Sequence, residues 1–210
     1  MLAPHELGVL TSLFPEKSSM TLKDVQKKCS YSYERIHSAV KSLDEKGAID
    51  MKRYGNVIVV SPDYNSDIAF LGFLHYMVSL RVKMLNEHKT AGMKNFMLGA
   101  KAKNNSKNPV VDDIFSCLLE ISNIDADMIS ITEVSRTPRN KIAFFYSPKR
   151  SVEGSRIDNL LLSMRYKYPT IRIEPRMEPE ENLERKKEDT LYLNSVVLKG
   201  IEKFYHLFYL

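Results

Sequence analysis

The sequence predicts an α+β fold in three parts, and three patterns support that prediction. Residues 1–66 carry short helical patterns followed by an alternating hairpin pattern, and residues 67–107 contain a long apolar helical segment followed by a basic connector. Residues 108–210 alternate helical segments with β-rich runs, which is typical of a mixed α/β domain. We therefore expect an N-terminal domain over 1–66, a connecting or dimerisation segment over 67–107 and a second domain over 108–210.

The N-terminal part is predicted to contain three short helices. Thr21, with Asp24 three residues later, is a capping-box-like start for the second helix. The third helix begins near Ser32 and ends before Gly47, a residue that is common just beyond a helix C-terminus. Its apolar residues share one face, which leaves the opposite face polar and available. Those apolar residues are Ile36, Ala39, Val40 and Leu43.

The order of three helices and a hairpin resembles the winged helix-turn-helix family over about 60 residues. The carrying segments are the helix at 21–29, the turn at 30–31, the helix ending in 40–49, and the Gly55-Asn56 wing between strands at 48–53 and 57–60. The resemblance implies a third helix in the DNA major groove and a hairpin on the neighbouring backbone. The expected DNA contacts are Tyr33, Arg35, His37, Ser38 and Lys41 of the helix and Lys52, Arg53 and Asn56 of the hairpin.

The positive charge of the chain is concentrated in its first half. Residues 1–107 contain 16 basic and 10 acidic residues, whereas residues 108–210 contain 15 and 16. A local positive excess points to a polyanionic partner, and we expect double-stranded DNA. Two other interpretations stay open, because the polar residues of the third helix can simply face solvent and many winged helices bind proteins.

The segment from Asp67 to Asn86 is apolar over most of its circumference. As a helix it must pack against another domain or a second copy of itself, and we expect a homodimer, which doubles the contact with a palindromic DNA site. Residues 88–107 hold five lysines and no acidic residue, which indicates a basic connector. Polar residues interrupt 68–85 and make it a poor bilayer span, so we expect no membrane partner.

The low number of cysteines and the composition of the N-terminus favour a cytoplasmic location. Two cysteines in 210 residues exclude a disulfide framework, and the first thirteen residues lack the basic start and apolar core of a signal peptide. The five histidines are scattered and the two cysteines lie far apart in the sequence. We therefore expect no metal site and no cofactor.

The run from Ile142 to Leu161 resembles the signature of polymerase-β-type nucleotidyltransferases. In that family a strand leads into Phe-Gly-Ser, a basic loop follows, and Ser-Asp-x-Asp supplies two metal-binding carboxylates. Phe145 matches the strand end, and the residues at 193–201 resemble the closing helix and strand of small family members. The resemblance implies a nucleotidyltransferase-like domain whose degenerate nucleotide site comprises Ser147, Lys149, Arg150, Ser155 and Asp158.

Two functional positions depart from that family pattern. Tyr146 replaces the glycine that lets the backbone approach the triphosphate, and Arg156 replaces the first metal-binding carboxylate. Exchanging a carboxylate for a cation changes the local charge by two and opposes a divalent ion. Glu174 is the only nearby candidate for a third carboxylate. We therefore expect a domain without catalytic activity that serves dimerisation or sensing.

A charged run and the apolar tail of the second domain also allow structural predictions. The charged run 178–189 is predicted to be a solvated helix face with pairs such as Glu181 to Arg185. The apolar tail from Phe204 to Leu210 is expected to pack onto the domain or across a subunit interface.

Taken together, these patterns predict a cytoplasmic, homodimeric, DNA-binding transcriptional regulator with a catalytically lost nucleotidyltransferase-like domain. Two alternatives remain at this point. One is a divergent nucleotidyltransferase whose missing ligand comes from elsewhere, and the other is an antitoxin-like protein-interaction module.

Overall fold

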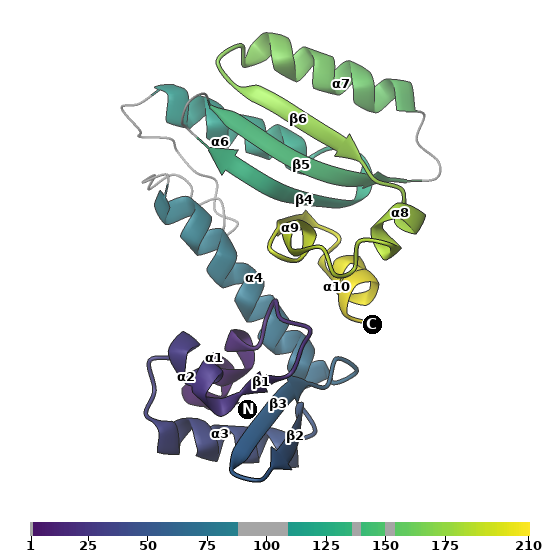
Figure 1. The fold of residues 1–210 in the computed structure, drawn as a ribbon. Helices are drawn as coiled ribbons and strands as arrows, with labels where there is room; N and C mark the ends of the chain where they lie inside the picture. Colours follow the sequence, from purple (N-terminus) through teal and green to yellow (C-terminus); the bar gives the residue numbers. More distant parts are fainter. Residues whose placement is uncertain (1, 88–108, 136–139, 150–153) are drawn as a thin grey trace. The chain divides into compact units, whose positions relative to one another are not determined.

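The chain is a mixed α+β protein with two β-sheets. The computed structural model describes residues 2–87, 109–135, 140–149 and 154–210, and it divides into two compact units (Figure 1). The first unit runs to Ser79 and also includes Tyr209 and Leu210, and the second runs from Leu80 to Phe208. The basic connector predicted at 88–107 lies outside the described residues.

The first unit combines helices with a three-stranded antiparallel sheet. Its elements are α1 (Pro4–Ser12), β1 (Met20–Thr21), α2 (Leu22–Lys28), α3 (Tyr33–Glu45), β2 (Ile49–Tyr54), β3 (Val57–Pro62) and most of α4 (Asp67–Glu87). The strand order is β1-β3-β2. The three helices and the hairpin predicted for residues 1–66 are confirmed as secondary structure.

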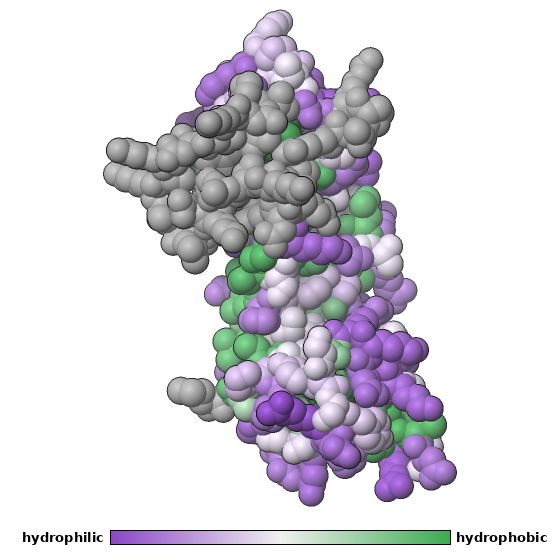
Figure 2. All heavy atoms as spheres, turned by 90° about the vertical axis from the view of Figure 1, so that its left-hand side faces the viewer, coloured by the Kyte–Doolittle hydropathy of each residue, from purple (hydrophilic) through white to green (hydrophobic). Residues whose placement is uncertain are grey.

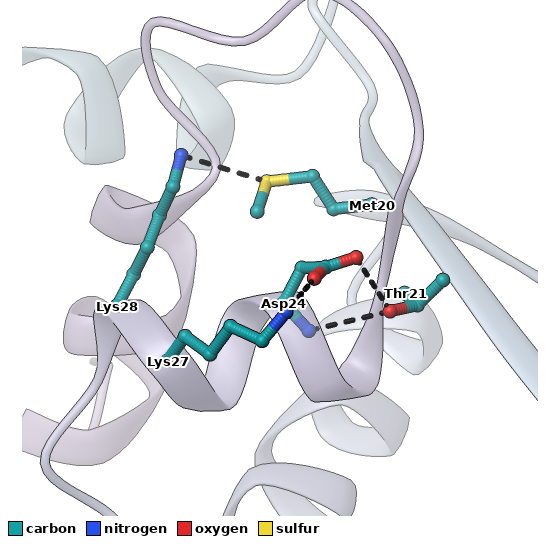
Figure 3. A network of polar contacts seen from close by, with 5 residues as sticks. All are labelled: Met20, Thr21, Asp24, Lys27 and Lys28. Carbon is teal, nitrogen blue, oxygen red and sulfur yellow. Dashed lines mark hydrogen bonds and ion pairs between the residues drawn. The ribbon is translucent and has the colours of Figure 1, made fainter.

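The second helix begins where the sequence pattern predicts. The Thr21 hydroxyl oxygen accepts a hydrogen bond from the Asp24 backbone N–H at 3.2 Å, and the same hydroxyl donates to the Asp24 carboxylate at 2.7 Å (Figure 3). Lys27 Nζ lies 2.8 Å from the other Asp24 oxygen, and Lys28 Nζ lies 3.9 Å from Met20 Sδ. Because the first N–H groups of a helix have no partner inside it, this cap fixes the start of α2.

The third helix is held by a cap at each end and a buried stripe between them. Ser32 Oγ accepts from the Arg35 backbone N–H at 3.4 Å, and Gly47 takes a φ of 65° just beyond the C-terminus. Its four apolar residues, Ile36, Ala39, Val40 and Leu43, are fully buried in the core of the first unit. The opposite face of α3 is therefore left pointing outward.

Strands β2 and β3 form a hairpin with a two-residue turn. Their pairing runs from Ile49 opposite Pro62 to Tyr54 opposite Val57, so Gly55 and Asn56 make the turn. Gly55 has a φ of 59°, a conformation that only glycine adopts without strain. The short turn fixes the pairing register of β2 and β3.

The second unit is built on a four-stranded sheet in the order β6-β5-β4-β7. Strands β5 and β6 are parallel and the other pairs are antiparallel. The elements are α6 (Pro109–Ser122), β4 (Ala126–Ser135), β5 (Lys141–Pro148), α7 (Gly154–Lys167), β6 (Arg172–Met177), α8 (Glu180–Glu184), α9 (Thr190–Leu193), β7 (Val196–Lys199) and α10 (Ile201–Tyr209).

Strand β5 is buried on both faces. Ile142, Phe144 and Tyr146 pack in the core cluster that also includes residues of α6 and α7. Phe145 points the other way and contacts Tyr192 of α9, with ring centroids 4.8 Å apart. Successive side chains of a strand alternate between its faces, so helices cover the sheet on both sides at this strand (Figure 1).

The prediction of a solvated helix face over residues 178–189 is correct only in part, since Glu180, Glu181 and Glu184 are exposed on a short helix. Only Glu180–Glu184 is an α-helix there, and Glu178 is buried instead of solvated. The Glu178 carboxylate accepts hydrogen bonds from Lys186 Nζ and from the Tyr192 hydroxyl, the latter at 2.7 Å. Burial by itself raises the pKa of Glu178, but these two donors hold it below its ordinary value. The Tyr192 partner lies fourteen residues away, outside the charged run, so the local charge pattern does not reveal it.

The apolar tail is buried, as predicted, except for Leu210, which is 48% exposed. Phe204, Tyr205, Leu207, Phe208 and Tyr209 are each at most 7% exposed. Helix α4, in contrast, is buried on one face only, since Phe73 and Met77 are covered while Leu71 and Val78 are about half exposed, at 51% and 52%. A second copy over that exposed face stays a prediction. Among the described helices, none has the length and apolar character needed to cross a bilayer.

Candidate functional site

The outward face of α3 carries every side chain of that helix that was predicted to contact DNA. Tyr33, Arg35, His37, Ser38 and Lys41 are all exposed. The hairpin residues Lys52, Arg53 and Asn56 are exposed as well. On the face seen in Figure 2, mainly hydrophilic side chains cover the first unit at the lower end of the view. The eight predicted residues are thus accessible to a partner.

A hollow of about 440 Å³ brings five of the eight residues together. Its walls are Tyr33, His37 and Ser38 from α3 and Arg53 and Asn56 from the hairpin, with Glu34 and Ile58 completing it. Arg53 Nε donates to the Gly55 carbonyl oxygen at 3.0 Å, which ties its side chain to the turn. The rings of Tyr33 and His37 lie 6.4 Å apart between centroids.

The other three predicted residues lie outside this hollow. At 100° per residue, Arg35 projects from the flank of α3 that faces away from His37. Lys41 lies one turn beyond His37, and Lys52 lies on β2 opposite Val59. The eight predicted residues are therefore spread over α3 and the hairpin, and five of them line the hollow.

The cations among these eight residues have no internal counter-charge. In the described part of the chain, no carboxylate lies within ion-pair distance of Arg35, Lys41, Lys52 or Arg53. Other lysines of the same unit are paired, for example Lys46 with Glu6 at 2.6 Å. Two exposed acids, Glu34 and Glu45, also lie on α3, and Glu34 lines the hollow. The result is four cations without an ion pair in the described chain, with two exposed acids, Glu34 and Glu45, on the same helix.

The hairpin also presents apolar residues that the sequence analysis did not assign to the site. Tyr54 and Val57, on either side of the turn, are 64% and 48% exposed, and Ile58 lines the hollow. The signal for Val57 was present in the sequence, because residues 57–60 are all apolar and successive side chains of a strand point to opposite faces, so one pair has to face outward.

A larger pocket, of about 1140 Å³, lies at the carboxyl end of β5 in the second unit. Ser147, Lys149 and Asp158, three residues of the predicted degenerate nucleotide site, line it. Arg150 lies outside the described residues. Ser155 is placed in the first turn of α7, but its side chain lies outside the described part of the structure.

The described residues that line this pocket carry a net negative charge. Five carboxylates line it, from Asp127, Asp158, Glu180, Glu181 and Glu184, against the ammonium groups of Lys149 and Lys203. Lys149 is paired with Asp125 at 2.6 Å, and this hydrogen bond raises the pKa of the lysine and lowers that of the acid. A phosphate chain would meet an excess of three negative charges here.

The departures from the nucleotidyltransferase pattern are visible in the geometry. Tyr146 packs its ring in the core and lines the pocket, and burial, followed by the charge of Asp158, raises the pKa of its hydroxyl. Arg156 lines a separate cavity of about 120 Å³ beside Asp125. Glu174 forms ion pairs with Lys141 at 3.0 Å and Arg172 at 2.6 Å and does not line the pocket.

The carboxylates of α8 were missed as pocket residues by the sequence analysis. They follow β6, which runs parallel to β5, so both strands end at the same edge of the sheet and the residues after them meet there. The described residues contain no group of three or more His, Cys, Asp or Glu side chains able to hold a metal ion.

Comparison with known proteins does not assign this chain to a family. Neither protein-family models, nor curated proteins, nor solved structures gave a match to this chain. The two family resemblances therefore rest on the residues that carry them, and function has to be argued from the two sites.

Proposed function

We propose that the chain is a DNA-binding transcriptional regulator whose residues 1–66 act as a winged helix-turn-helix. The proposal is supported by the order of helices and hairpin and by the exposure of the polar face of α3. An α-helix fits the major groove of B-DNA, and a short hairpin beside it reaches the adjacent backbone. Arg35 would read a guanine, and Lys52 and Arg53 would contact phosphates.

The observation that carries this proposal is the set of four cations on α3 and the hairpin that form no ion pair in the described chain. Phosphate oxygens supply the counter-charge that the described chain does not. Each neutralised phosphate contributes about −0.9 to the slope of log K against log salt, so four contacts give about −3.6 per chain. Between 50 and 200 mM salt, this slope corresponds to an affinity loss of about 150-fold.

The proposal also assigns roles to helix α4 and to the second unit. We infer a cytoplasmic homodimer, in which the exposed side of α4 contacts a second copy. We also infer that the second unit is a nucleotidyltransferase-like domain without catalysis, used for dimerisation or sensing. Tyr146, which stands where the family has the glycine of the phosphate loop, lines the pocket and supports this inference, because its side chain occupies space that a triphosphate needs.

The test is a fluorescence-anisotropy titration of a labelled random-sequence duplex with the full chain. The interface variant carries Arg35→Ala, Lys41→Ala, Lys52→Ala and Arg53→Ala. A matched control removes four cations of the second unit, the exposed Arg165, Arg176 and Arg185 and the half-buried Lys187.

The wild type and the control are expected to bind at 50 mM salt, and the interface variant to lose binding by more than 100-fold. Absence of any duplex binding by the wild type at 50 mM salt would end the proposal. Equal losses in both variants would mean that net charge, and not the placement of the cations on α3 and the hairpin, attracts the DNA.

A further inference from the structure

An acidic side chain lies in the middle of the α3 face that is proposed to enter the major groove. At 100° per residue, Glu34 shares the outward stripe of the helix with Ser38 and Lys41, opposite the buried Ile36. Glu34 is exposed and lines the hollow between α3 and the hairpin. A carboxylate repels the phosphates of DNA, so at this position it weakens binding unless the DNA offers it a hydrogen-bond donor.

The described part of the first unit does not use the Glu34 carboxylate for its own structure. Among the described residues this group forms no ion pair and no hydrogen bond, and Ser32 Oγ caps α3 by accepting from the Arg35 backbone N–H. Asp24 of α2 shows the contrast, because its carboxylate accepts a hydrogen bond from the Thr21 hydroxyl at 2.7 Å. What remains for Glu34 is the attraction to the helix dipole, which is weak for an exposed acid and is screened by salt.

The hairpin wall of the hollow leaves this carboxylate open as well. Arg53 pairs with Ile58 across the hairpin, so both side chains lie on one face, and both line the hollow. Arg53 Nε donates to the Gly55 carbonyl oxygen at 3.0 Å, and no ion pair joins Arg53 to Glu34. The hollow therefore contains an acceptor that is available to a partner.

The edges of the four bases in the major groove differ in what they offer to a carboxylate. Guanine and thymine present acceptors, adenine presents an amine beside an acceptor nitrogen, and cytosine presents an amine alone. A carboxylate only accepts hydrogen bonds, so acceptors on guanine, thymine and adenine repel it. Cytosine is therefore the base whose edge matches this side chain.

We propose that Glu34 is a specificity-determining residue that accepts a hydrogen bond from the N4 amine of a cytosine. The inference rests on the proposed winged-helix function and deepens it. Glu34 is in the first turn of α3, and the N-terminal residues of a recognition helix are the ones that reach base edges. On any other sequence the carboxylate stays unpaired near phosphates, and this penalty is the source of the discrimination.

Selection of sequences from a random duplex library by the full chain measures the base preference at each position. The test variant is Glu34→Gln, which keeps the length of the side chain and whose amide can pair with adenine. The matched control is Glu45→Gln, an exposed acid on the same stripe, about 16 Å further along α3 and outside the hollow. Both side chains are exposed, so both variants should fold, and far-UV circular dichroism checks this.

The wild type and Glu45→Gln are expected to select the same sequence, with cytosine favoured over thymine about fivefold or more at one position. Glu34→Gln should lose that preference, to adenine or to no base, and should bind a random duplex at least as tightly as the wild type.

Three results would overturn the inference and leave the proposed DNA binding intact. They are an unchanged cytosine preference in Glu34→Gln, the same loss in Glu45→Gln, and a wild type that binds duplexes without any base preference. Absence of duplex binding by the wild type would overturn the proposed function together with this inference.

Discussion

Neutralising Glu6 should destabilise the first unit by removing the ion pair that ties the start of α1 to the end of α3. The Glu6 carboxylate lies 2.6 Å from Lys46 Nζ and accepts from the Ala3 backbone N–H at 2.7 Å, and its side chain is only 6% exposed. The hydrogen bond from Lys46, with a smaller contribution from Ser42, lowers the pKa of Glu6 from 4.5 to about 2. In Glu6→Gln the amide oxygen can still accept from Ala3, so the substitution isolates the charge.

The size of the effect follows from the pKa. A lowering from 4.5 to about 2 corresponds to about 3.4 kcal/mol at 1.36 kcal/mol per pKa unit. Lys46 is about one-third exposed, so solvent screening reduces the expected loss to about 1–3 kcal/mol. Because the folded pKa is depressed, this stabilisation is complete above pH 4.5 and disappears as the pH falls through 2. More than half of the difference between wild type and variant should be gone at pH 3.

Urea denaturation followed by far-UV circular dichroism at pH 7 and pH 3 measures this difference. Hydrogen exchange of peptides from α1 and α3 assigns the loss to the first unit. Glu16→Gln, which removes the exposed pair with Lys28, is the control and should cost under about 1 kcal/mol. A Glu6→Gln effect that equals the control at pH 7, or that grows as the pH falls, would refute the reasoning.

Three further substitutions test other parts of the structure. Gly200→Ala should lower the free energy of unfolding by about 2 kcal/mol or more, and with it the thermal midpoint, because φ is 72° and the new Cβ overlaps a backbone carbonyl oxygen of β4. Gly47→Ala is the comparison: its φ is 65° but no atom lies within 4 Å of the new Cβ, so it should cost only about 1 kcal/mol. Lys52→Ala should reduce the salt slope of duplex binding by about 0.9 in anisotropy titrations, and an unchanged slope would remove this residue from the interface. Lys186→Met should lower the free energy of unfolding in urea by about 2–4 kcal/mol, because it leaves the buried Glu178 carboxylate with the Tyr192 hydroxyl as its only described side-chain donor. An unchanged free energy of unfolding would contradict this role of Lys186.

The sequence predicts most of the first unit because its signals are local. Ser32, the apolar stripe and Gly47 mark the start, the buried face and the end of α3 within sixteen residues. The same stripe identifies the outward side chains, all of which are exposed. Which of them share a hollow is not local, since Arg53 and Asn56 reach Tyr33 and His37 only through the register of the hairpin.

The second unit shows where local patterns fail. Ser147, Lys149 and Asp158 do share a pocket, because a strand followed by a helix places them at one end of β5. The acids of α8 join them only because β6 pairs with β5 in parallel, a choice made by the tertiary fold. Glu178 is buried for a similar reason, since Tyr192 and Lys186 reach it from later turns of the chain.

The buried stripe and the outward face of α3 are under different evolutionary constraints. Stability constrains the buried stripe, because adding or removing one methyl group there disturbs the packing of the neighbouring core. The outward residues have few neighbours, so their substitutions should add independently and at small cost in stability. If α3 binds DNA as proposed, exchanging its exposed side chains would change the preferred sequence while the hydrophobic core stays the same.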